Sequence, residues 1–446
     1  MKPLLSFALS LWLLIGLNWC IAGQTTIGQT SEPLPFPGNL MRKGINEGNY
    51  LAALAELQQR ETQYLASSQW RGPFLDFISY ASSFVGNYQA ANLYFTMRQK
   101  LNPTQKLASS AIDQYTPLSA LSVISQIADS QQVIMINEAH HVPLHRALTT
   151  RLLPLLYAKG FRYLALEDAS PADAELHQRG YPLRRFGAYT IEPVFGNLIR
   201  TALRLGYKII PYEYEGNCAA KPDDPYFCAN ERERGQAQNI YDRILKEQPQ
   251  AKILVHGGAG HIQERIGKNV STMAAHFKTI SKIDPFTIDQ MEMSEYLNRE
   301  YASALYLYVT EKWSLKEPTV FQSRQGGFWN TGEGTLDQVD LKVFHPQTVY
   351  EEGRPTWLKM DGSRKPYAVF GESATSKLKS VLSTYPNPFL VQAFVSTEDA
   401  GAVPVDQIVV ANPKGVSVLM LPAGSFRIRA IDETGKLLGE EVTSIK

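Results

Sequence analysis

The stretch "VIMINEAHHVPLHR", residues 133–146, decides the fold of this chain. Its four leading residues are apolar, and they run directly into a polar segment that holds three of the chain's eight histidines. Pro143 stands where the first turn of a helix accepts proline. A short, wholly apolar run that is followed by a helix start is typical of a buried strand in a parallel sheet.

The same pattern of apolar run and helix recurs downstream. The further runs are YLAL (163–166), KIIPY (208–212) and KILVH (252–256), with helical stretches between them. Apolar strands that alternate with helices predict an α/β fold, a parallel sheet with helices on both faces. We expect ALYLYV (304–309) to form a fifth strand. This core is expected to span residues 117–315.

Two further regions flank the predicted core. GNYLAAL (48–54) and GNYQAAN (86–92) lie in helical patterns, and residues 36–115 therefore resemble the helical hairpins of tetratricopeptide-type repeats. Alternating apolar and polar residues predict a small, β-sandwich-like domain over residues 385–446. The stretch between the core and this β-rich domain, residues 316–384, carries no pattern that assigns it.

The N-terminus has the features of a segment that is removed during export. A lysine, an apolar run and small residues near Ala22 predict a signal peptide over residues 1–22. Cys20 follows Leu17 by three positions, as in lipoproteins, but Trp19 stands where a small residue is expected, so a lipoprotein is the less favoured alternative. No later apolar run is long enough to span a bilayer. We expect an exported protein, periplasmic or secreted.

The two remaining cysteines are ten positions apart. Cys218 and Cys228 flank a Pro- and Asp-rich stretch, CAAKPDDPYFC. An even pair in an exported protein predicts a disulfide that closes a surface loop. A zinc site is the weaker alternative, because no histidine lies near in sequence.

The charge balance limits the classes of partner. The formal net charge is +1, which gives no electrostatic case for nucleic acid or for an anionic membrane surface. We expect a small-molecule substrate or ligand. A protein partner is conceivable through the helical N-terminal segment or the C-terminal β domain.

Polar side chains follow each of the four core strands. Because the carboxyl ends of parallel strands meet at one edge of a sheet, where ligands bind, we expect these side chains to share a site. They are, in strand order, Glu138, His140 and His141, then Glu167 and Asp168, then Glu213 and Glu215, then His256 and His261.

These residue types allow two kinds of chemistry. A carboxylate beside an imidazole fixes the imidazole's tautomer and raises its basicity, which suits a general base acting on water. The same residues could instead hold a divalent metal that acidifies a bound water. His145 lies in the first turn of the helix opened by Pro143, where the helix dipole disfavours protonation, so it is either a neutral acceptor or ligand, or a residue of the helix face.

Two other motifs fit a binding edge. HGGAGH (256–261) lets the backbone approach a ligand closely, although it lacks the third glycine of a dinucleotide fingerprint. RERGQAQNI (232–240) begins a helix, and Arg232 or Arg234 could bind an anionic group there. The alternative for both arginines is a solvated helix start.

The order of these motifs resembles a known superfamily. Glu138-Ala-His-His, Glu167 at the end of GFRYLALE, RERGQAQN and GAGH occur in the order expected of the erythromycin esterase-like and ChaN-like haem-binding superfamily. The chain is more distantly similar to the Tiki and TraB metalloprotease-like proteins. The resemblance covers residues 117–315 only. One departure is Asn137, because the family usually has glycine there.

The branches of this superfamily imply different sites. The esterase-like branch implies that Glu138 and His141 activate water without a metal or another cofactor. It also implies Glu167 as the second acidic residue and His261 as the second histidine. The haem-binding branch implies Glu138, His140 and His145. VPLHR favours the haem branch, whereas GFRYLALE and RERGQAQN favour the esterase branch.

The sequence therefore supports an exported, esterase-like hydrolase as first hypothesis. Its alternatives are a periplasmic haem- or metal-binding protein of the ChaN-like type and a metal-dependent Tiki/TraB-like peptidase. The predicted catalytic residues are Glu138, His140, His141, Glu167 and His261. The predicted substrate-binding residues are His145, Glu213, His256, Arg232 and Arg234. The metal ligands, in the alternatives only, are His140, His145 and His261.

Overall fold

The computed structural model describes residues 34–46, 48–98, 109–171, 173–219, 221, 223–267, 269–297, 299–331, 338–385 and 388–446. The predicted signal peptide and Cys20 lie outside these residues. Residues Pro35–Lys446 form one unit. No helix among the described residues combines the length and the apolar character needed to cross a membrane.

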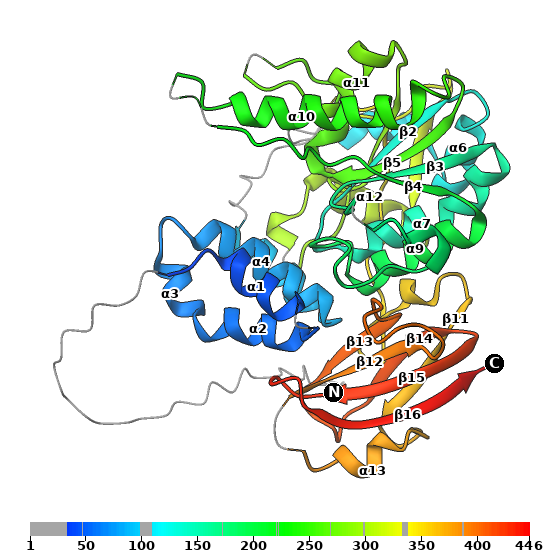
Figure 1. The fold of residues 1–446 in the computed structure, drawn as a ribbon. Coiled ribbons are helices and arrows are strands. Elements are labelled where there is room, and N and C mark those ends of the chain that lie inside the picture. The colour runs from blue at the N-terminus through cyan, green and yellow to red at the C-terminus, as the bar shows by residue number, and fades with distance from the viewer. Residues whose placement is uncertain are drawn as a thin grey trace, which may run out of the picture. The chain divides into compact units, whose positions relative to one another are not determined.

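A six-stranded parallel sheet is the centre of the chain (Figure 1). Its spatial order is β4-β3-β5-β2-β6-β8, and every neighbouring pair is parallel. In chain order the strands are β2 (Val133–Glu138), β3 (Phe161–Leu166), β4 (Lys208–Pro211), β5 (Lys252–Gly258), β6 (Phe286–Asp289) and β8 (Leu341–Lys342).

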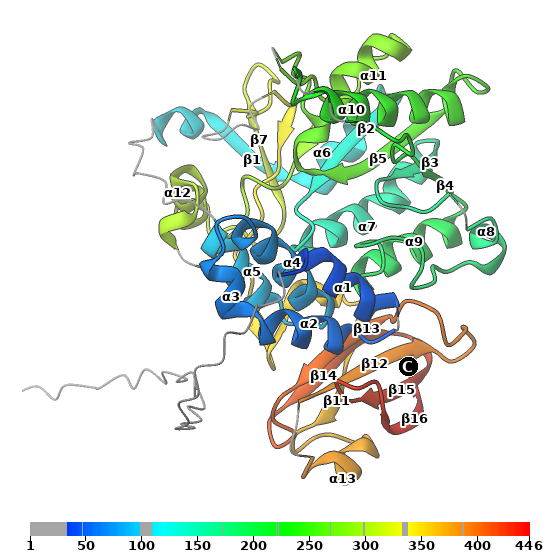
Figure 2. The same cartoon turned by 60° about the vertical axis from the view of Figure 1, so that its left-hand side comes forward.

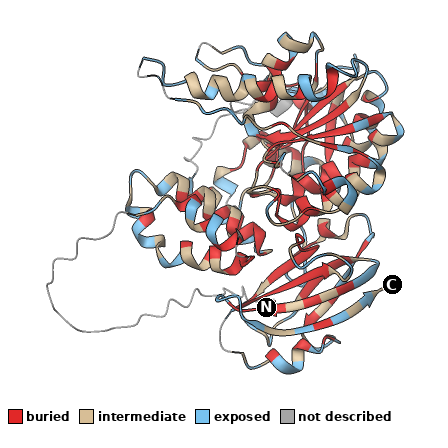
Figure 3. Cartoon of the chain, viewed as in Figure 1, coloured by how far each residue is buried: buried red, intermediate tan, exposed pale blue. Residues whose placement is uncertain are grey.

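Both faces of the sheet are covered by helices, as the uniformly apolar strands predict. Alternate strand residues pack into two separate clusters. Ile134 and Ile136 of β2 join the cluster under α6 (Ala120–Ile127), α7 (Pro143–Ala158) and α9 (Pro193–Leu205). Val133 and Met135 join the opposite cluster under α10 (Phe227–Ile240), η2 (Tyr241–Leu245) and α11 (Met273–Ser281). All six residues of β2 are buried, and Figure 3 shows that most of the central sheet is buried.

The predicted α/β class with helices on both faces is confirmed, and so are four predicted strands. The prediction of a strand at ALYLYV (304–309) is wrong, because this segment is the start of α12 (Ala304–Trp313). Ser303 caps the helix by accepting a hydrogen bond from the Tyr306 backbone N–H. Leu305, Tyr306 and Val309 are the buried residues, which is helical spacing.

Four helices and a short one precede the core. They are α1 (Pro37–Asn46), α2 (Tyr50–Gln59), α3 (Glu61–Ala66), α4 (Arg71–Phe84) and α5 (Tyr88–Arg98) (Figure 2). The repeated Gly-Asn-Tyr explains why α2 and α5 begin alike. Gly48 and Gly86 both have positive φ, and Asn49 and Asn87 each accept a hydrogen bond from the backbone three residues on. The result is two helical hairpins, α1–α2 and α4–α5.

The C-terminal third is rich in antiparallel strands. A four-stranded sheet has the order β13-β12-β15-β16, and β11 pairs with β14. Its strands are β11 (Arg364–Phe370), β12 (Phe389–Val395), β13 (Asp406–Val410), β14 (Ser417–Pro422), β15 (Gly424–Ile431) and β16 (Leu437–Ile445), with helix α13 (Leu378–Leu382). Since β11 lies within residues 316–384, part of the unassigned stretch belongs to these strands.

The remaining described elements are short. They are η1 (Ser109–Gln114), β1 (Tyr115–Ser119), α8 (Leu176–Arg179), η3 (Ala259–Ile262), η4 (Arg299–Tyr301), β7 (Thr319–Ser323), β9 (Tyr350–Glu351), β10 (Arg354–Pro355) and η5 (Thr356–Lys359). β1 pairs antiparallel with β7, which ties the start of the core to the stretch that follows it.

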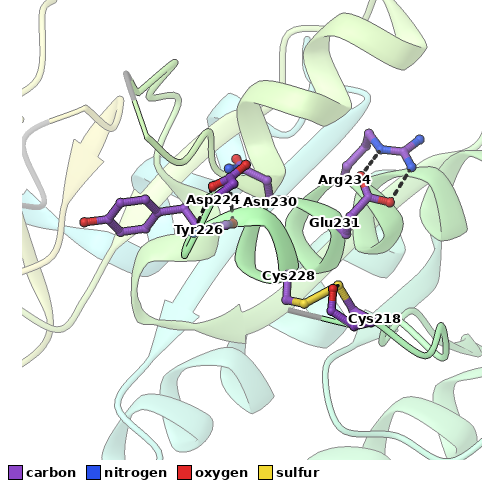
Figure 4. The surroundings of a disulfide bond; sticks show 8 residues. Cys218, Asp224, Tyr226, Cys228, Asn230, Glu231 and Arg234 are labelled. Atoms are coloured by element: carbon purple, nitrogen blue, oxygen red, sulfur yellow. Dashed lines mark hydrogen bonds and ion pairs between the residues drawn. A yellow bond between two sulfur atoms is a disulfide. The ribbon is translucent and has the colours of Figure 1, made fainter. Parts of the chain in front are cut away.

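The predicted disulfide is present in the structure. Cys218 and Cys228 are bonded, with their Cα atoms 5.6 Å apart. Figure 4 shows the bond at the beginning of α10, with Glu231 and Arg234 one turn further along that helix. The bond therefore ties the loop that follows β4 to the helix that leads to β5.

Candidate active site

Glu138, the last residue of β2, is buried at the carboxyl edge of the sheet and accepts four hydrogen bonds. Its Oε1 accepts from Arg146 Nη2 at 2.6 Å and from His140 Nδ1 at 2.8 Å. Its Oε2 accepts from Arg146 Nε at 2.7 Å and from His256 Nε2 at 2.8 Å. A carboxylate has about four such positions. Glu138 is therefore fully occupied in orienting its neighbours.

Arg146 is a fully buried cation that joins two buried carboxylates. Besides Glu138, it donates from Nη1 to Glu192 at 3.0 Å. Burial raises the pKa of Glu138, but Arg146 and the hydrogen bonds outweigh this and hold that pKa well below its usual range. Burial prevails at Glu192, whose pKa is raised. Glu192 also caps α9 by accepting from the Phe195 backbone N–H.

His140 is the histidine that Glu138 holds. Because its Nδ1 lies 2.8 Å from the carboxylate, the proton belongs on Nδ1 and Nε2 carries the lone pair. The ring stacks on Tyr189 with centroids 3.9 Å apart, and its side chain is 21% exposed. A Cβ placed on Gly258 would lie 2.9 Å from His140 Nε2 and 3.1 Å from Glu167 Oε2. The lone pair therefore lies close to β5, near Glu167.

Asp168 fixes the loop that carries Tyr189. Its Oδ2 accepts hydrogen bonds from the backbone N–H groups of Ala188 and Tyr189, at 2.5 and 2.7 Å. Burial raises its pKa to about 6 despite these hydrogen bonds. The residue has a positive φ of 57°, which aspartate tolerates better than most residues. Asp168 thus positions the ring on which His140 stacks.

We expect Asp168→Ala to destabilise the fold by about 1–3 kcal/mol, since it leaves buried N–H groups without an acceptor. Asp129→Ala, which removes an exposed carboxylate that pairs with Lys159, serves as the comparison. Urea unfolding measures both changes, and tyrosine exposure to solvent reports on Tyr189. An Asp168→Ala protein as stable as the unchanged chain would contradict this role.

Glu167 follows β3 and anchors a second group of charges. Its Oε2 accepts from the Gly258 backbone N–H at 2.5 Å, and its Oε1 accepts from Arg232 Nη2 at 2.8 Å. His261 Nε2 lies 3.3 Å from the same Oε1. Burial raises the pKa of Glu167, but His261 and Arg232 outweigh burial and hold that pKa well below its usual range. Glu167 is therefore a carboxylate flanked by cations.

His261 lies between two carboxylates. Its Nδ1 is 2.7 Å from Glu233, and its Nε2 is 3.3 Å from Glu167. Burial lowers its pKa, but these two carboxylates outweigh burial and raise it to about 10. A protonated His261 cannot accept a hydrogen bond from Arg232, although Arg232 Nη1 is only 3.2 Å from its Nε2. The two cations are held together by Glu167.

Glu213 completes the second group. Arg232 donates to it from Nε at 2.9 Å and from Nη2 at 2.7 Å, and Gln236 donates to it at 3.0 Å. The Arg232 side chain is 41% exposed and that of Glu213 is 29% exposed. This group therefore reaches the surface, whereas the group around Glu138 does so only at His140.

Three of the predicted site residues lie elsewhere. His141 points away and stacks on Phe95, with ring centroids 3.7 Å apart. His145 Nδ1 accepts from the Ala139 backbone N–H at 3.0 Å, and its Nε2 contacts Ser294 at 3.0 Å. Arg234 pairs with Glu231, as Figure 4 shows, and its side chain is 54% exposed. His141 lies in the turn after β2, next to His140. His145 on α7 and Arg234 on α10 are one and two residues from Arg146 and Arg232, and they point away from the site.

His256 is brought to the site, but as an internal support. It is buried on β5, where its Nε2 donates to Glu138 and its Nδ1 lies 3.1 Å from the Thr149 hydroxyl. Because His256 is buried, it can orient Glu138, as His140 does, but it cannot contact a molecule that binds from solvent. We therefore assign it a positioning role.

The predicted metal set does not converge. Over the described part of the chain, no three or more His, Cys, Asp or Glu side chains are grouped as a metal ion requires. His145 is separated from the other two histidines because α7 turns it toward Ser294. Burial lowers the pKa of His145 well below 6.5, so the ring is a neutral acceptor for the backbone. The ligands that the haem-binding branch implies, Glu138, His140 and His145, do not converge for the same reason.

Asn137 has a structural role that glycine could not fill. Its amide nitrogen donates to Asp289 at 2.7 Å and to the Ala259 carbonyl at 3.2 Å. Its amide oxygen accepts from the Gln290 backbone N–H at 2.9 Å. The side chain therefore binds the ends of β2 and β6 to the turn after β5, directly beside Glu138.

Several residues that shape this site were missed from the sequence. They are Arg146, Thr149, Tyr189, Glu192, Tyr212 and Glu233. Arg146 alone had a usable signal. It stands in the first turn of α7, where the helix dipole is unfavourable to a cation, so a buried acidic partner was to be expected.

Comparison with known proteins adds little. No family model and no curated protein matches the chain. Solved structures that match include the type III effector HopBA1, at 11% identity and TM-score 0.32, over 52% of this chain and 97% of that one. RRSP, a MARTX toxin effector domain from Vibrio vulnificus CMCP6, matches at 13% identity and TM-score 0.29, over 68% and 59%.

A third solved structure is the C-terminal region of Pasteurella multocida toxin, described as having a thiol-protease-like catalytic triad. It matches at 10% identity and TM-score 0.32, over 81% of this chain and 52% of that one. Likenesses at these TM-scores carry no argument about this chain. Its function has to be argued from its own residues.

Proposed function

We propose that this chain is an exported hydrolase that cleaves an ester or related acyl bond with water activated by His140. The supporting observation is the pair of Glu138 and His140, joined at 2.8 Å with the histidine partly exposed. A carboxylate on Nδ1 leaves Nε2 free to take a proton from water, which is the geometry of a general base. His140, rather than His141, fills this role.

The second charged group supplies what acyl hydrolysis needs next. Attack by water places negative charge on the former carbonyl oxygen, and fixed cationic donors stabilise that charge. Arg232 and His261 are such donors, and Glu167 and Glu213 hold Arg232 in place. In this proposal His140 moves the proton, while Arg232 and His261 bind and polarise the substrate. In this proposal, both the proton transfer and the charge stabilisation are performed by side chains of this protein.

The test compares the two adjacent histidines. His140→Gln should reduce the hydrolysis of p-nitrophenyl esters by about 100-fold or more, the usual contribution of a general base. His141→Gln should change it less than about threefold, because this ring packs on Phe95 outside the site. The rate is followed by nitrophenolate release, with circular dichroism confirming that both variants fold.

Two further results would overturn the proposal. One is an equal loss in both variants, which would mean that the substitutions act through folding. The other is no turnover of any ester, amide or phosphoester by the unchanged protein. An activity abolished by chelators, or a haem absorbance band lost in His140→Gln, would favour the metal- or haem-binding alternatives.

A further inference from the structure

A cavity whose lining includes no residue of the Glu138 group lies between the α/β core and the C-terminal strands. Its volume is about 550 Å³, and residues of α7, α9, β11, β12, β14 and β15 line it. Its charged lining residues are Arg151, Arg200, Arg204, Arg364 and Asp361. None of them belongs to the proposed active site. Four guanidinium groups against one carboxylate make this lining strongly basic.

Arg364, the first residue of β11, is the most informative of these arginines. The residue is only 7% exposed, and it donates from Nη2 to the Val405 carbonyl at 2.8 Å. Over the described residues it forms no ion pair, because the nearby Asp406 is taken by Arg354 at 2.6 Å. Burial lowers the pKa of Arg364, yet a guanidinium stays charged in proteins. A buried cation without a carboxylate is costly unless an anion binds beside it.

The other arginines leave the cavity with excess positive charge. Arg200 is paired with Glu398, but its buried Nη1 has no hydrogen-bond partner within the described chain. Arg151 is paired with Asp361 at 2.7 Å. Arg204 is exposed and forms no ion pair with any described residue. Once these pairs are counted, Arg364 and Arg204 remain uncompensated.

The uncharged lining combines polar residues, namely Thr150, Asn197, Thr201, Ser363 and Ser425, with an apolar wall. Val194, Leu358, Val405 and Phe426 all face this volume and are otherwise buried. A wall of this kind suits a hydrocarbon or aryl group, while the arginines suit a carboxylate or phosphate. The volume falls within the usual range of about 300–1,000 Å³ for sites that hold small organic ligands.

We propose that this cavity binds an amphipathic organic anion, whose carboxylate or phosphate head contacts Arg364 and whose apolar body lies on Val405 and Phe426. The site is separate from Glu138 and His140, so it does not depend on the hydrolase proposal. Because a carboxylate and a phosphate present the same acceptor oxygens to arginine, both heads belong to the proposal, and the test distinguishes them.

The test is calorimetric titration of the full chain carrying His140→Gln, which prevents any hydrolysis of the probe. The probes are octanoate and octyl phosphate, with 1-octanol and inorganic phosphate as the matched neutral and headgroup-only compounds. We expect at least one of the two amphiphiles to bind at least tenfold more tightly than both matched compounds. The better of the two identifies the head. Equal binding of octanol, equal binding of inorganic phosphate, or no binding of either amphiphile would overturn the proposal.

Substitutions locate the binding. Arg364→Met should weaken it at least tenfold and Arg204→Met several-fold, whereas Arg299→Met, an exposed arginine paired with Glu311, should leave it unchanged. Because Arg364→Met alters a buried residue, Thr201→Glu on α9 provides a second test, since it places a negative charge in the lining. Amphiphile binding that survives both Arg204→Met and Thr201→Glu would refute this location.

Discussion

Replacing Arg146 by methionine is expected to lower the free energy of unfolding by about 3–5 kcal/mol, the usual cost of removing one partner from a buried ion pair. The guanidinium is fully buried, and it donates to two carboxylates, Glu138 and Glu192, that are equally buried. Without it, both carboxylates lose the buried cation that they share. Methionine keeps the apolar bulk that packs near Phe195. Urea unfolding at neutral pH measures the loss.

The pH dependence identifies the mechanism of this loss. Without Arg146, burial raises the pKa of both carboxyls in the folded state above the unfolded value of 4.5. A group of this kind loses its stability contribution as pH rises through the folded pKa. The deficit of Arg146→Met should therefore be smaller at pH 5 than at pH 8. The opposite trend would show that lost packing, not unpaired charge, causes the deficit.

A compensating variant and a control complete this experiment. Arg146→Met combined with Glu138→Gln and Glu192→Gln removes the charges together, and it should recover most of the lost stability. Arg162→Met alters an exposed arginine that lies over Tyr157, and it should change stability by about 0.5 kcal/mol or less. A triple variant no more stable than Arg146→Met would contradict the charge argument.

The strands that could be predicted from the sequence are those that contain an apolar run. β2, β3, β4 and β5 each carry a run that is apolar throughout, and all four were found. β6, FTID, is as short as β4 but alternates apolar and polar residues, and β8 has only two residues, so neither shows an apolar run. ALYLYV was mistaken for a strand because a short apolar run fits a buried helix equally well. Tertiary packing decides such cases.

The sheet topology predicted the edge on which the site lies. It did not predict which side chains contact one another within the site. Parallel pairing brings the ends of β2, β3 and β5 together, so Glu138, Glu167 and His256 were bound to meet there. Which of two adjacent histidines faces inward depends on the turn between β2 and α7, and on Phe95 and Tyr189, both distant in sequence. The pattern of apolar and polar residues within 133–146 does not predict those contacts.

The chain should lose stability steeply between about pH 6.5 and pH 10, because His261 titrates there. Its pKa is 6.5 as the ordinary value and about 10 in the fold, where Glu167 and Glu233 hold the cation. A group with a raised folded pKa stabilises the fold fully below its unfolded pKa and loses that contribution as pH rises. A difference of 3.5 units corresponds to a loss on the order of 5 kcal/mol. His141 and His345, whose pKa burial lowers to about 3, stay neutral over this range.

Chemical denaturation at pH 6.5, 8 and 9.5 measures this dependence. His261→Gln removes the titrating group, so its free energy of unfolding should change far less over the same range. His276→Gln, on α11, is the matched control and should keep the steep dependence, since burial lowers rather than raises the pKa of His276. A flat profile in the unchanged chain, or an equally steep one in His261→Gln, would show that Glu167 and Glu233 do not hold a protonated His261, and the proposed function would then have to assign the stabilising cation to Arg232 instead.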